Sequence, residues 1–295
     1  MPLVSVLTTS YNRADFIGEA IESVLASSFE DFEYIIVDDR STDDTYKIAK
    51  SYEARDSRVR VYQNEQNLGD YPNRNKAASY ASGKYLKYVD ADDLVYPTGI
   101  QVLASMMEMH PDVGYGLCSL PQRHERPFPI RLPPREAYLS HFMGTPVFHK
   151  APLSAIINRD AFEKVGGFPA RRMSSDYEMW LKLSQVFPVL LMPDGVVWYR
   201  EHDSQEMNEH SRFIGQYIEI TLAYLGSPDC PLNELEVNTA IARVRLNSRQ
   251  DALRWALKGK TSLSLKIQKA AKLSFRDYFA LCGMIAVYPF RKLFR

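Results

Sequence analysis

Short apolar runs alternate with helix-period segments through the first 120 residues, and this order constrains the fold more than any other feature. Such alternation is typical of β-α-β units, whose successive strands lie parallel in one sheet. The expected strands cover residues 3–9, 32–37, 58–63, 85–89 and 113–120. The sequence therefore predicts an α/β fold with a mostly parallel central sheet flanked by helices.

The pattern changes in the second half of the chain. Between residues 121 and 152 prolines cluster and no period persists, which predicts a long connection over the sheet. Regular structure is expected again as a run over 153–158, helices near 160–165 and from Ser174, and a strand over 189–199. Past residue 211 the sequence indicates mostly helix. We expect one large domain over residues 1–210 and a helical C-terminal appendage over residues 211–295.

Composition excludes some classes of partner and compartment. Lysine plus arginine and aspartate plus glutamate each number 36, so charge balance gives no reason to expect a nucleic-acid partner. The cysteines, Cys118, Cys230 and Cys282, form no CxxC pair, which favours neither a disulfide framework nor a zinc site. No basic leader opens the sequence, and no run reaches the ~20 apolar residues of a spanning helix. We therefore predict a cytoplasmic protein.

A short apolar stretch at residues 278–290 lies between basic residues near the C-terminus. These basic neighbours are Lys266, Lys269, Lys272, Arg276 and several within residues 291–295. Such a segment can lie in the interface of an anionic membrane, so peripheral contact of residues 266–295 with its cytoplasmic face is one interpretation. The alternative is an ordinary packing helix or a homodimer contact.

Three carboxylates follow the expected strand at residues 85–89, namely Asp90, Asp92 and Asp93. Alternation along a strand puts Asp90 and Asp92 on the same side, where a cation would offset their repulsion. Oxygen ligands favour Mn²⁺ or Mg²⁺, and ions of the magnesium type often take further ligands from water and substrate phosphates. The motif thus predicts a divalent cation and a phosphorylated substrate. The alternative is that the acids cap the helix after Pro97, which explains one of them better than three.

Polar clusters follow four of the expected strands, at residues 8–13, 38–41, 64–70 and 90–93. In open parallel sheets ligands bind beyond the carboxyl ends of strands, so we expect these clusters to converge on one cleft. The glycine-rich turn of dinucleotide enzymes and the P-loop are both missing from the sequence. Phosphates would therefore be held by a cation and basic side chains.

The order of the motifs resembles the family 2 inverting glycosyltransferases with the GT-A fold, over roughly the first 205 residues. The motifs are VSVLTTSYN at 4–12, VDDRSTD at 37–43, NLG at 67–69, DADD at 90–93 and SDYEMWL at 175–181. One departure is Arg40, where the family commonly has glycine; it could change the turn or add a positive charge near the nucleotide. The resemblance implies a nucleotide-binding part over residues 1–120 and an acceptor-side part over residues 121–210.

The resemblance also implies a set of nucleotide-binding residues. Thr9 and Tyr11 would lie against the base and ribose, and Asp39 would accept the ring N–H of the base, with Asp38 supporting its loop. Without the resemblance, Asp38 and Asp39 are equally well explained by a strand-end turn with a helix cap. Arg74 would approach the nucleotide or diphosphate, because a guanidinium donates parallel hydrogen bonds to phosphate oxygens. The other residues assigned to this role are Arg13, Asn67, Asp90 and Arg200.

For the metal, the resemblance implies Asp92 as a direct ligand and Asp90 as a second ligand or a ribose partner. Asp93 would support them. His202, in the segment Tyr199-Arg200-Glu201-His202, resembles a family histidine that reaches the metal or diphosphate. The alternative for His202 is a solvated loop histidine without a function.

Asp176 matches the position of the family's general base. It would take the proton of the acceptor hydroxyl as that oxygen attacks the anomeric carbon, because a neutral alcohol is a poor nucleophile. Spacing alone indicates a helix N-terminus at residues 174–176, which is compatible with a base on a rigid platform. Glu178 lies two residues further along this helix and points elsewhere.

The function implied by the resemblance is metal-dependent, inverting transfer of a sugar from a nucleotide-diphosphate sugar to an acceptor hydroxyl. A UDP-sugar is favoured as donor, and a carbohydrate or lipid-linked carbohydrate as acceptor, in bacterial-type polysaccharide or glycoconjugate synthesis. One alternative is a sugar-phosphate nucleotidyltransferase, although the glycine-rich basic loop usual after its first strand is missing. Another is a non-catalytic sugar-nucleotide binding protein, although Asp176 and the residues 90–93 are intact.

Overall fold

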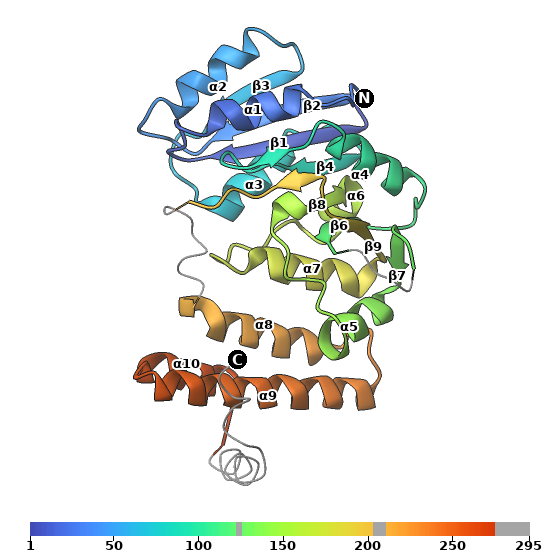
Figure 1. Ribbon diagram of the computed structural model, residues 1–295, viewed down its shortest axis with the longest axis vertical. Coiled ribbons are helices and arrows are strands. Elements are labelled where there is room, and N and C mark those ends of the chain that lie inside the picture. The colour runs from blue at the N-terminus through green and yellow to red at the C-terminus, as the bar shows by residue number, and fades with distance from the viewer. Residues whose placement is uncertain (122–125, 203–210, 275–295) are drawn as a thin grey trace. The chain divides into compact units, whose positions relative to one another are not determined.

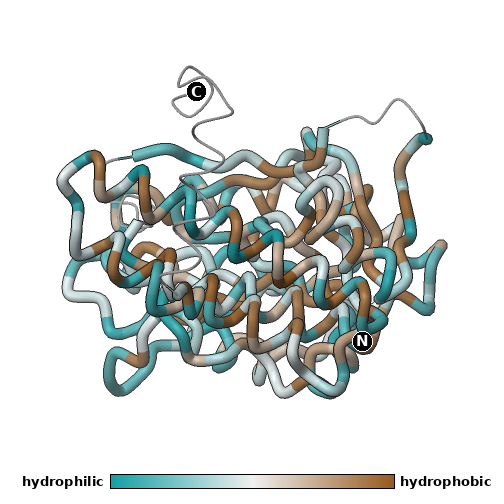
Figure 2. The backbone as a smooth tube through the Cα atoms, turned by 90° about the horizontal axis from the view of Figure 1, so that it is seen from below, coloured by the Kyte–Doolittle hydropathy of each residue, from teal (hydrophilic) through white to brown (hydrophobic). Residues whose placement is uncertain are grey.

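The computed structural model describes residues 1–121, 126–202 and 211–274, and the chain divides into two compact units, Met1–Asp203 and Ser204–Arg295. The first unit contains a large sheet with helices around it, which can be followed from blue to yellow in Figure 1. The second contains three helices among its described residues. Figure 2 colours the same backbone by hydropathy and shows both hydrophilic and hydrophobic stretches along the chain.

The sheet of the first unit has the order β3-β2-β1-β4-β8-β6-β9-β7 in the part of the chain described. Its strands are β1 (Val4–Ser10), β2 (Phe32–Asp38), β3 (Val59–Gln63), β4 (Tyr85–Tyr88), β6 (Tyr115–Leu120), β7 (Ile130–Leu132), β8 (Ala155–Asn158) and β9 (Val189–Pro193). Strand β1 pairs in parallel with β2 and β4, β2 with β3, and β6 with β9. Strands β8 and β7 run antiparallel to their neighbours. The predicted mostly parallel sheet is confirmed.

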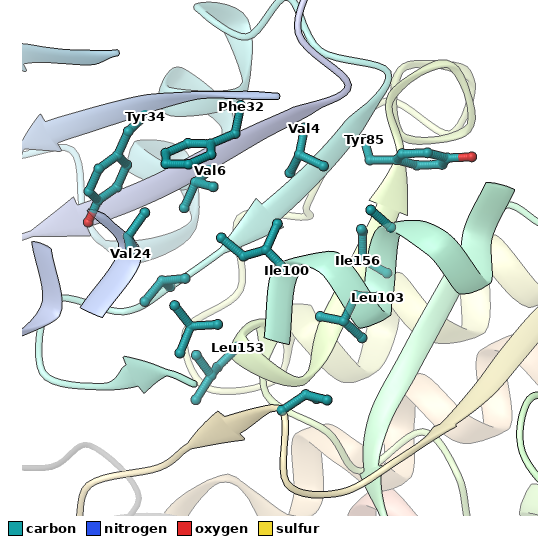
Figure 3. Packing of buried hydrophobic residues seen from close by; sticks show 14 of the residues in the cluster. Val4, Val6, Val24, Phe32, Tyr34, Tyr85, Ile100, Leu103, Leu153 and Ile156 are labelled. Carbon is teal, nitrogen blue, oxygen red and sulfur yellow. The ribbon is translucent and has the colours of Figure 1, made fainter. Parts of the chain in front are cut away.

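Helices cover both faces of this sheet because successive strand residues point to opposite sides. The helices are α1 (Ile17–Leu25), α2 (Thr45–Glu53), α3 (Asp70–Ser79), α4 (Gly99–Glu108), α5 (Pro134–Met143), α6 (Arg159–Lys164) and α7 (Ser175–Val186). On one face, Val6 of β1 belongs to the same buried cluster as Val24 of α1 and Ile100 of α4 (Figure 3). Elsewhere in the sheet, the Tyr115 ring of β6 stacks on Trp180 of α7, with ring centroids 5.5 Å apart. Burial on both sides explains why the strands read as nearly continuous apolar runs.

Residues 121–152, predicted as an irregular connection, contain regular structure, so that prediction is wrong. Strand β7 pairs with β9, and α5 begins at Pro134, a residue whose fixed φ suits the first position of a helix. The expected strand over 189–199 is also two strands: β9 ends at Pro193, and β10 (Val197–Trp198) pairs antiparallel with β5 (Leu94–Val95). Between them Gly195 adopts φ +74°, a left-handed conformation that redirects the chain.

The second unit is helical, as predicted, with α8 (Ile214–Leu225), α9 (Glu234–Leu257) and α10 (Thr261–Ala270). Helix α9 begins with a capping box, in which the Asn233 side chain accepts from the Glu236 N–H and Glu236 accepts from the Asn233 N–H. Within the described residues, no helix is both long enough and apolar enough to cross a bilayer. The apolar stretch 278–290 and Cys282 lie outside the described residues.

Candidate functional site

The turn after β2 holds two buried carboxylates that organise the neighbouring loops. Asp38 accepts hydrogen bonds from the Ser41 N–H at 3.0 Å and from the Gln63 side chain at 3.0 Å. Asp39 accepts from the Asn64 amide and from the backbone N–H groups of residues 68 and 69, each at 2.8 Å. Asp38 therefore supports the turn, while Asp39 fixes the loop that follows β3.

Arg40 occupies this turn in the left-handed conformation, with φ +66°. Glycine adopts that conformation without steric cost, whereas a residue with a Cβ does not. The backbone geometry thus explains why glycine suits this position and shows that the chain keeps the turn with arginine there. The arginine side chain is exposed.

Thr9 lies near the end of β1, and the turn after β1 carries Tyr11 and Arg13. Tyr11 is 47% exposed and Thr9 half-buried, next to Asn12, whose φ is +52°. Asn67, in the adjacent loop, is exposed and donates from its side chain to the Asp39 carbonyl at 3.1 Å. Tyr11 and Asn67 are thus accessible beside the ends of β1 and β3, where a nucleotide was predicted.

Asp90 and Asp92, which follow β4, each contact a basic side chain from another segment. Asp90 lies 2.6 Å from Arg74 Nη1 of α3, and the same guanidinium is 2.8 Å from Asp70. Asp92 accepts from Arg13 Nε at 2.9 Å, and its Oδ2 lies 3.1 Å from His202 Nε2. Predicted site residues from four parts of the sequence therefore meet at the carboxyl ends of β1 and β4.

Asp93 is buried behind this cluster and accepts from the Arg200 N–H at 2.8 Å. Burial, together with the negative charges of Asp90 and Asp92, raises the pKa of Asp93 to about 8. Burial, reinforced by repulsion from the neighbouring carboxylates, therefore favours retention of a proton on Asp93. A bound cation would relieve that repulsion.

Arg200 fixes the Tyr199–His202 segment rather than extending away from it. Its Nε donates to the Asp92 carbonyl at 2.8 Å, and its guanidinium reaches Glu19 of α1 at 2.5 Å. The guanidinium also lies over the rings of Phe16 and Trp198, at 5.2 and 4.9 Å. In this structure Arg200 joins α1 to the acid motif, and its assignment to the nucleotide stays a prediction.

The donor chemistry of Asp92 and His202 fits a divalent cation. The two side chains bring an oxygen and a nitrogen within 3.1 Å of each other, as ligands of one ion would lie. No group of three or more His, Cys, Asp or Glu side chains suited to a metal occurs in the part of the chain described. Two protein ligands are compatible with Mg²⁺ or Mn²⁺ because substrate phosphates and water complete their coordination. Asp90, predicted as a second ligand or a ribose partner, is paired with Arg74 here, and its assignment stays a prediction.

Asp176 lies in the first turn of α7, where Oδ1 accepts from the Tyr177 N–H at 2.7 Å. Its carboxylate is also hydrogen-bonded to the phenol of Tyr71, and it feels the positive charge of Arg74. Burial outweighs these contacts and raises the pKa of Asp176 to about 7. A carboxyl group with this pKa can exchange a proton at neutral pH.

Tyr71 and Asp70, at the start of α3, belong to the site but were not predicted as functional residues. Tyr71 contacts Asp176, and Asp70 shares Arg74 with Asp90. The sequence signal that could have found them is their position within one helical turn of Arg74, because residues in one turn lie close together. Lys87 in β4 was also missed: it is fully buried and donates to the carbonyls of Tyr88 and Leu153, and burial lowers its pKa to about 8.

The fold and the acids at its strand ends define a protein of the GT-A class, built like enzymes that act on nucleotide sugars. The family model described as "Glycosyl transferase family 2" matches residues 5–166, more than half of the chain. The chain therefore belongs to glycosyl transferase family 2.

Similar proteins agree with this assignment. The "Putative teichuronic acid biosynthesis glycosyltransferase TuaG" of Bacillus subtilis is 48% identical over 92 residues, which cover 31% of this chain and 36% of TuaG. The "Putative glycosyltransferase EpsE" of the same organism is 32% identical over 191 residues, which cover 61% of this chain and 66% of EpsE. The chain thus spans about a third to two thirds of the length of these two relatives.

Solved structures share the fold. S. aureus TarS in complex with UDP-GlcNAc gives a TM-score of 0.68 at 18% identity, covering 91% of this chain and 81% of that one. The mannosyltransferase PcManGT of Pyrobaculum calidifontis, in complex with GDP-Man and Mn²⁺, gives a TM-score of 0.60 at 20% identity. The match covers 97% of this chain and 80% of PcManGT. The fold inferred from the motifs is confirmed.

Proposed function

We propose that this protein transfers a sugar from a nucleotide-diphosphate sugar to an acceptor hydroxyl with inversion at the anomeric carbon. The observation that carries the proposal is the contact chain from Asp176 to the acid motif. Asp176 contacts Tyr71 and feels the charge of Arg74, and Arg74 lies 2.6 Å from Asp90. A candidate base and a candidate diphosphate site are therefore adjacent, as direct displacement requires.

In the proposed reaction, Asp176 takes the proton of the acceptor hydroxyl. The acceptor oxygen forms its bond to the anomeric carbon while the bond from that carbon to the diphosphate oxygen breaks, and the electron pair leaves with the diphosphate. Because attack and departure occur on opposite sides, the configuration inverts. Rigid attachment to the first turn of α7 and the phenol of Tyr71 hold the carboxylate in position.

On the donor side, Thr9, Tyr11, Asp39 and Asn67 would contact the nucleoside, and Arg13 and Arg74 the diphosphate. A Mn²⁺ or Mg²⁺ ion held by Asp92 and His202 would neutralise charge on the departing diphosphate. The presence of Mn²⁺ in the PcManGT complex supports this assignment.

We propose a UDP-sugar as donor, supported by UDP-GlcNAc in the TarS complex, although PcManGT binds GDP-Man. The acceptor would be a carbohydrate or a lipid-linked carbohydrate of bacterial polysaccharide or glycoconjugate synthesis. The name of TuaG, which refers to teichuronic acid biosynthesis, supports that acceptor class. The cytoplasmic location and a homodimer stay predictions of the sequence.

The test is an assay of the full chain with a panel of nucleotide sugars, Mn²⁺ and glycan acceptors. We expect release of a nucleoside diphosphate together with a glycoside whose anomeric configuration, measured by NMR, is opposite to that of the donor. Release of pyrophosphate from a sugar phosphate and a nucleoside triphosphate would identify a nucleotidyltransferase instead. Donor binding without any transfer would favour a binding protein.

A further inference from the structure

The connection between α9 and α10 is strongly basic. Residues 252–272 contain no aspartate or glutamate. Their charged side chains are Arg254, Lys258, Lys260, Lys266, Lys269 and Lys272. We call this segment the α9–α10 tip. Its charge contrasts with the neutral balance of the whole chain, so basic residues are concentrated here.

Apolar side chains are exposed within the same tip. Leu257, the last residue of α9, is 64% exposed, and Leu265 of α10 is 63% exposed. Leu265 lies four residues after the start of α10, about one helical turn from the connection. Trp255 is half-buried beneath Lys260 and Lys258, whose ammonium groups lie 4.7 and 5.5 Å from its ring centroid. The tip therefore combines exposed apolar groups with lysines.

Helix dipoles account for only part of the positive charge of the tip. Basic residues favour the C-terminal end of a helix, which explains Arg254 and Lys258 on α9. The same tip is also the N-terminal end of α10, where Lys260 is the residue before the first turn and positive charge is unfavourable. Lys269 lies four residues after Leu265 and so shares its face of the helix. An external anionic surface would offset the repulsion among these groups.

The opposite end of α9 supplies an internal comparison. Leu235 is 76% exposed there, more than either leucine of the tip. Its neighbours in sequence are Glu234 and Glu236, so this exposed leucine lies among negative charges. A single exposed leucine is ordinary on a protein surface. The pairing of leucines with six basic residues distinguishes the tip.

We propose that the α9–α10 tip docks on an anionic lipid bilayer. Leu257, Leu265 and the edge of Trp255 would enter the interface between headgroups and acyl chains, while the lysines contact lipid phosphates. The proposal is independent of the sugar-transfer chemistry. It also extends the contact to the end of α9 and the start of α10, whereas the sequence indicated residues 266–295.

The experiment is flotation of the full chain with phosphatidylcholine vesicles, with and without phosphatidylglycerol. We expect binding only to the anionic vesicles, and weakening as salt is added. Replacing Lys258 and Lys260 with serine should lower the partition coefficient about fivefold for each lysine. The double substitution Leu257→Glu and Leu265→Glu should lower it by more than tenfold per position, because each change removes apolar area and adds repulsion.

Leu235→Glu on the same helix is the matched control, since it exchanges an exposed leucine far from the tip, and its vesicle binding should equal that of the unsubstituted chain. Circular dichroism during heating checks that every variant folds. Equal binding to neutral and anionic vesicles would overturn the proposal. The proposal would also be overturned if Leu235→Glu lost as much vesicle binding as the tip variants. Binding to a DNA duplex with no binding to vesicles would overturn it as well.

Discussion

Carboxylates are used differently in two regions of the first unit, the turn after β2 and the first turn of α7. In the turn after β2, Asp39 accepts from the Asn64 amide and two backbone N–H groups, and so fixes a loop. In the first turn of α7, desolvation of Asp176 outweighs its hydrogen bonds and raises its pKa to about 7. The same side-chain type is therefore a structural acceptor at the end of β2 and a group suited to proton transfer at the start of α7.

The two carboxylates differ in how far their surroundings compensate the negative charge of the ionised side chain. Hydrogen bonds to a carboxylate favour its ionised form, whereas burial favours the protonated form. Residues with pKa values displaced by burial next to a charged partner often occur at functional sites. The contrast predicts loss of catalysis at Asp176 and loss of stability at Asp39.

The largest effect is expected for Asp176→Asn. An amide cannot take the acceptor proton, so kcat should fall about a thousandfold, within the range for a general base. The measurement is nucleoside diphosphate release under saturating donor and acceptor. Glu178→Gln is the matched control, since it removes an acid from the same helical turn, and kcat should change by less than a few fold. Unchanged kcat in Asp176→Asn would remove the base from the proposed reaction.

Asp92→Asn should weaken binding of a nucleoside diphosphate in the presence of Mn²⁺ by about 10- to 100-fold. The expected cause is loss of a metal ligand that also contacts Arg13 and His202. Calorimetric titration with and without Mn²⁺ measures the effect, with the exposed Asp44→Asn as control. If the variant keeps the full benefit of Mn²⁺, Asp92 does not hold the ion.

Asp39→Asn should destabilise the protein by about 2 kcal/mol. The substituted amide can accept through one atom only, so at least one buried N–H of residues 68 and 69 loses its acceptor. Urea denaturation measures the free energy of unfolding. Asp44→Asn, whose ion pair with Lys47 is long and exposed, should change it by less than about 0.5 kcal/mol. Equal stability of the two variants would show that Asp39 does not hold the loop.

The pH dependence of kcat should report the ionisation of Asp176. Asp176 acts in its ionised form, so kcat should rise about tenfold per pH unit below pH about 7 and level off above it. Because the folded state raises this pKa above its unfolded value, ionisation of Asp176 costs stability as pH rises from about 4 to about 7. Asp176→Asn should therefore be more stable than the unsubstituted chain by about 1 to 3 kcal/mol near pH 8. An absent acidic limb in the rate profile would contradict the assignment.

The first half of the sheet was predictable because each strand and helix has a strong local signal. In α1, buried Ile17, Ala20, Ile21 and Val24 follow the helical period, and β1 to β4 lie within two residues of the expected strands. The acids come directly after these strands. Their approximate location therefore followed from the rule that parallel strands end at one edge.

Helix α5 was missed because polar residues interrupt its apolar face. His141 is buried, and its Nδ1 accepts from the N–H groups of Val147 and Phe148 at 3.2 and 3.1 Å. A histidine in this role looks like a polar loop residue in the sequence. Its partners lie after the helix, so the stabilising contacts are visible only once the chain has folded back.

The sequence by itself determined the parallel arrangement of β1 to β4, the acids at their ends and the membership of a family, because these depend on local periodicity and motif order. Only the tertiary structure decided that Arg13 and His202 meet at Asp92, and that Arg74 lies beside both Asp90 and Asp176. It also decided the pKa of Asp176. Burial and the positions of distant charges set these properties, and neither is encoded within a short stretch of residues.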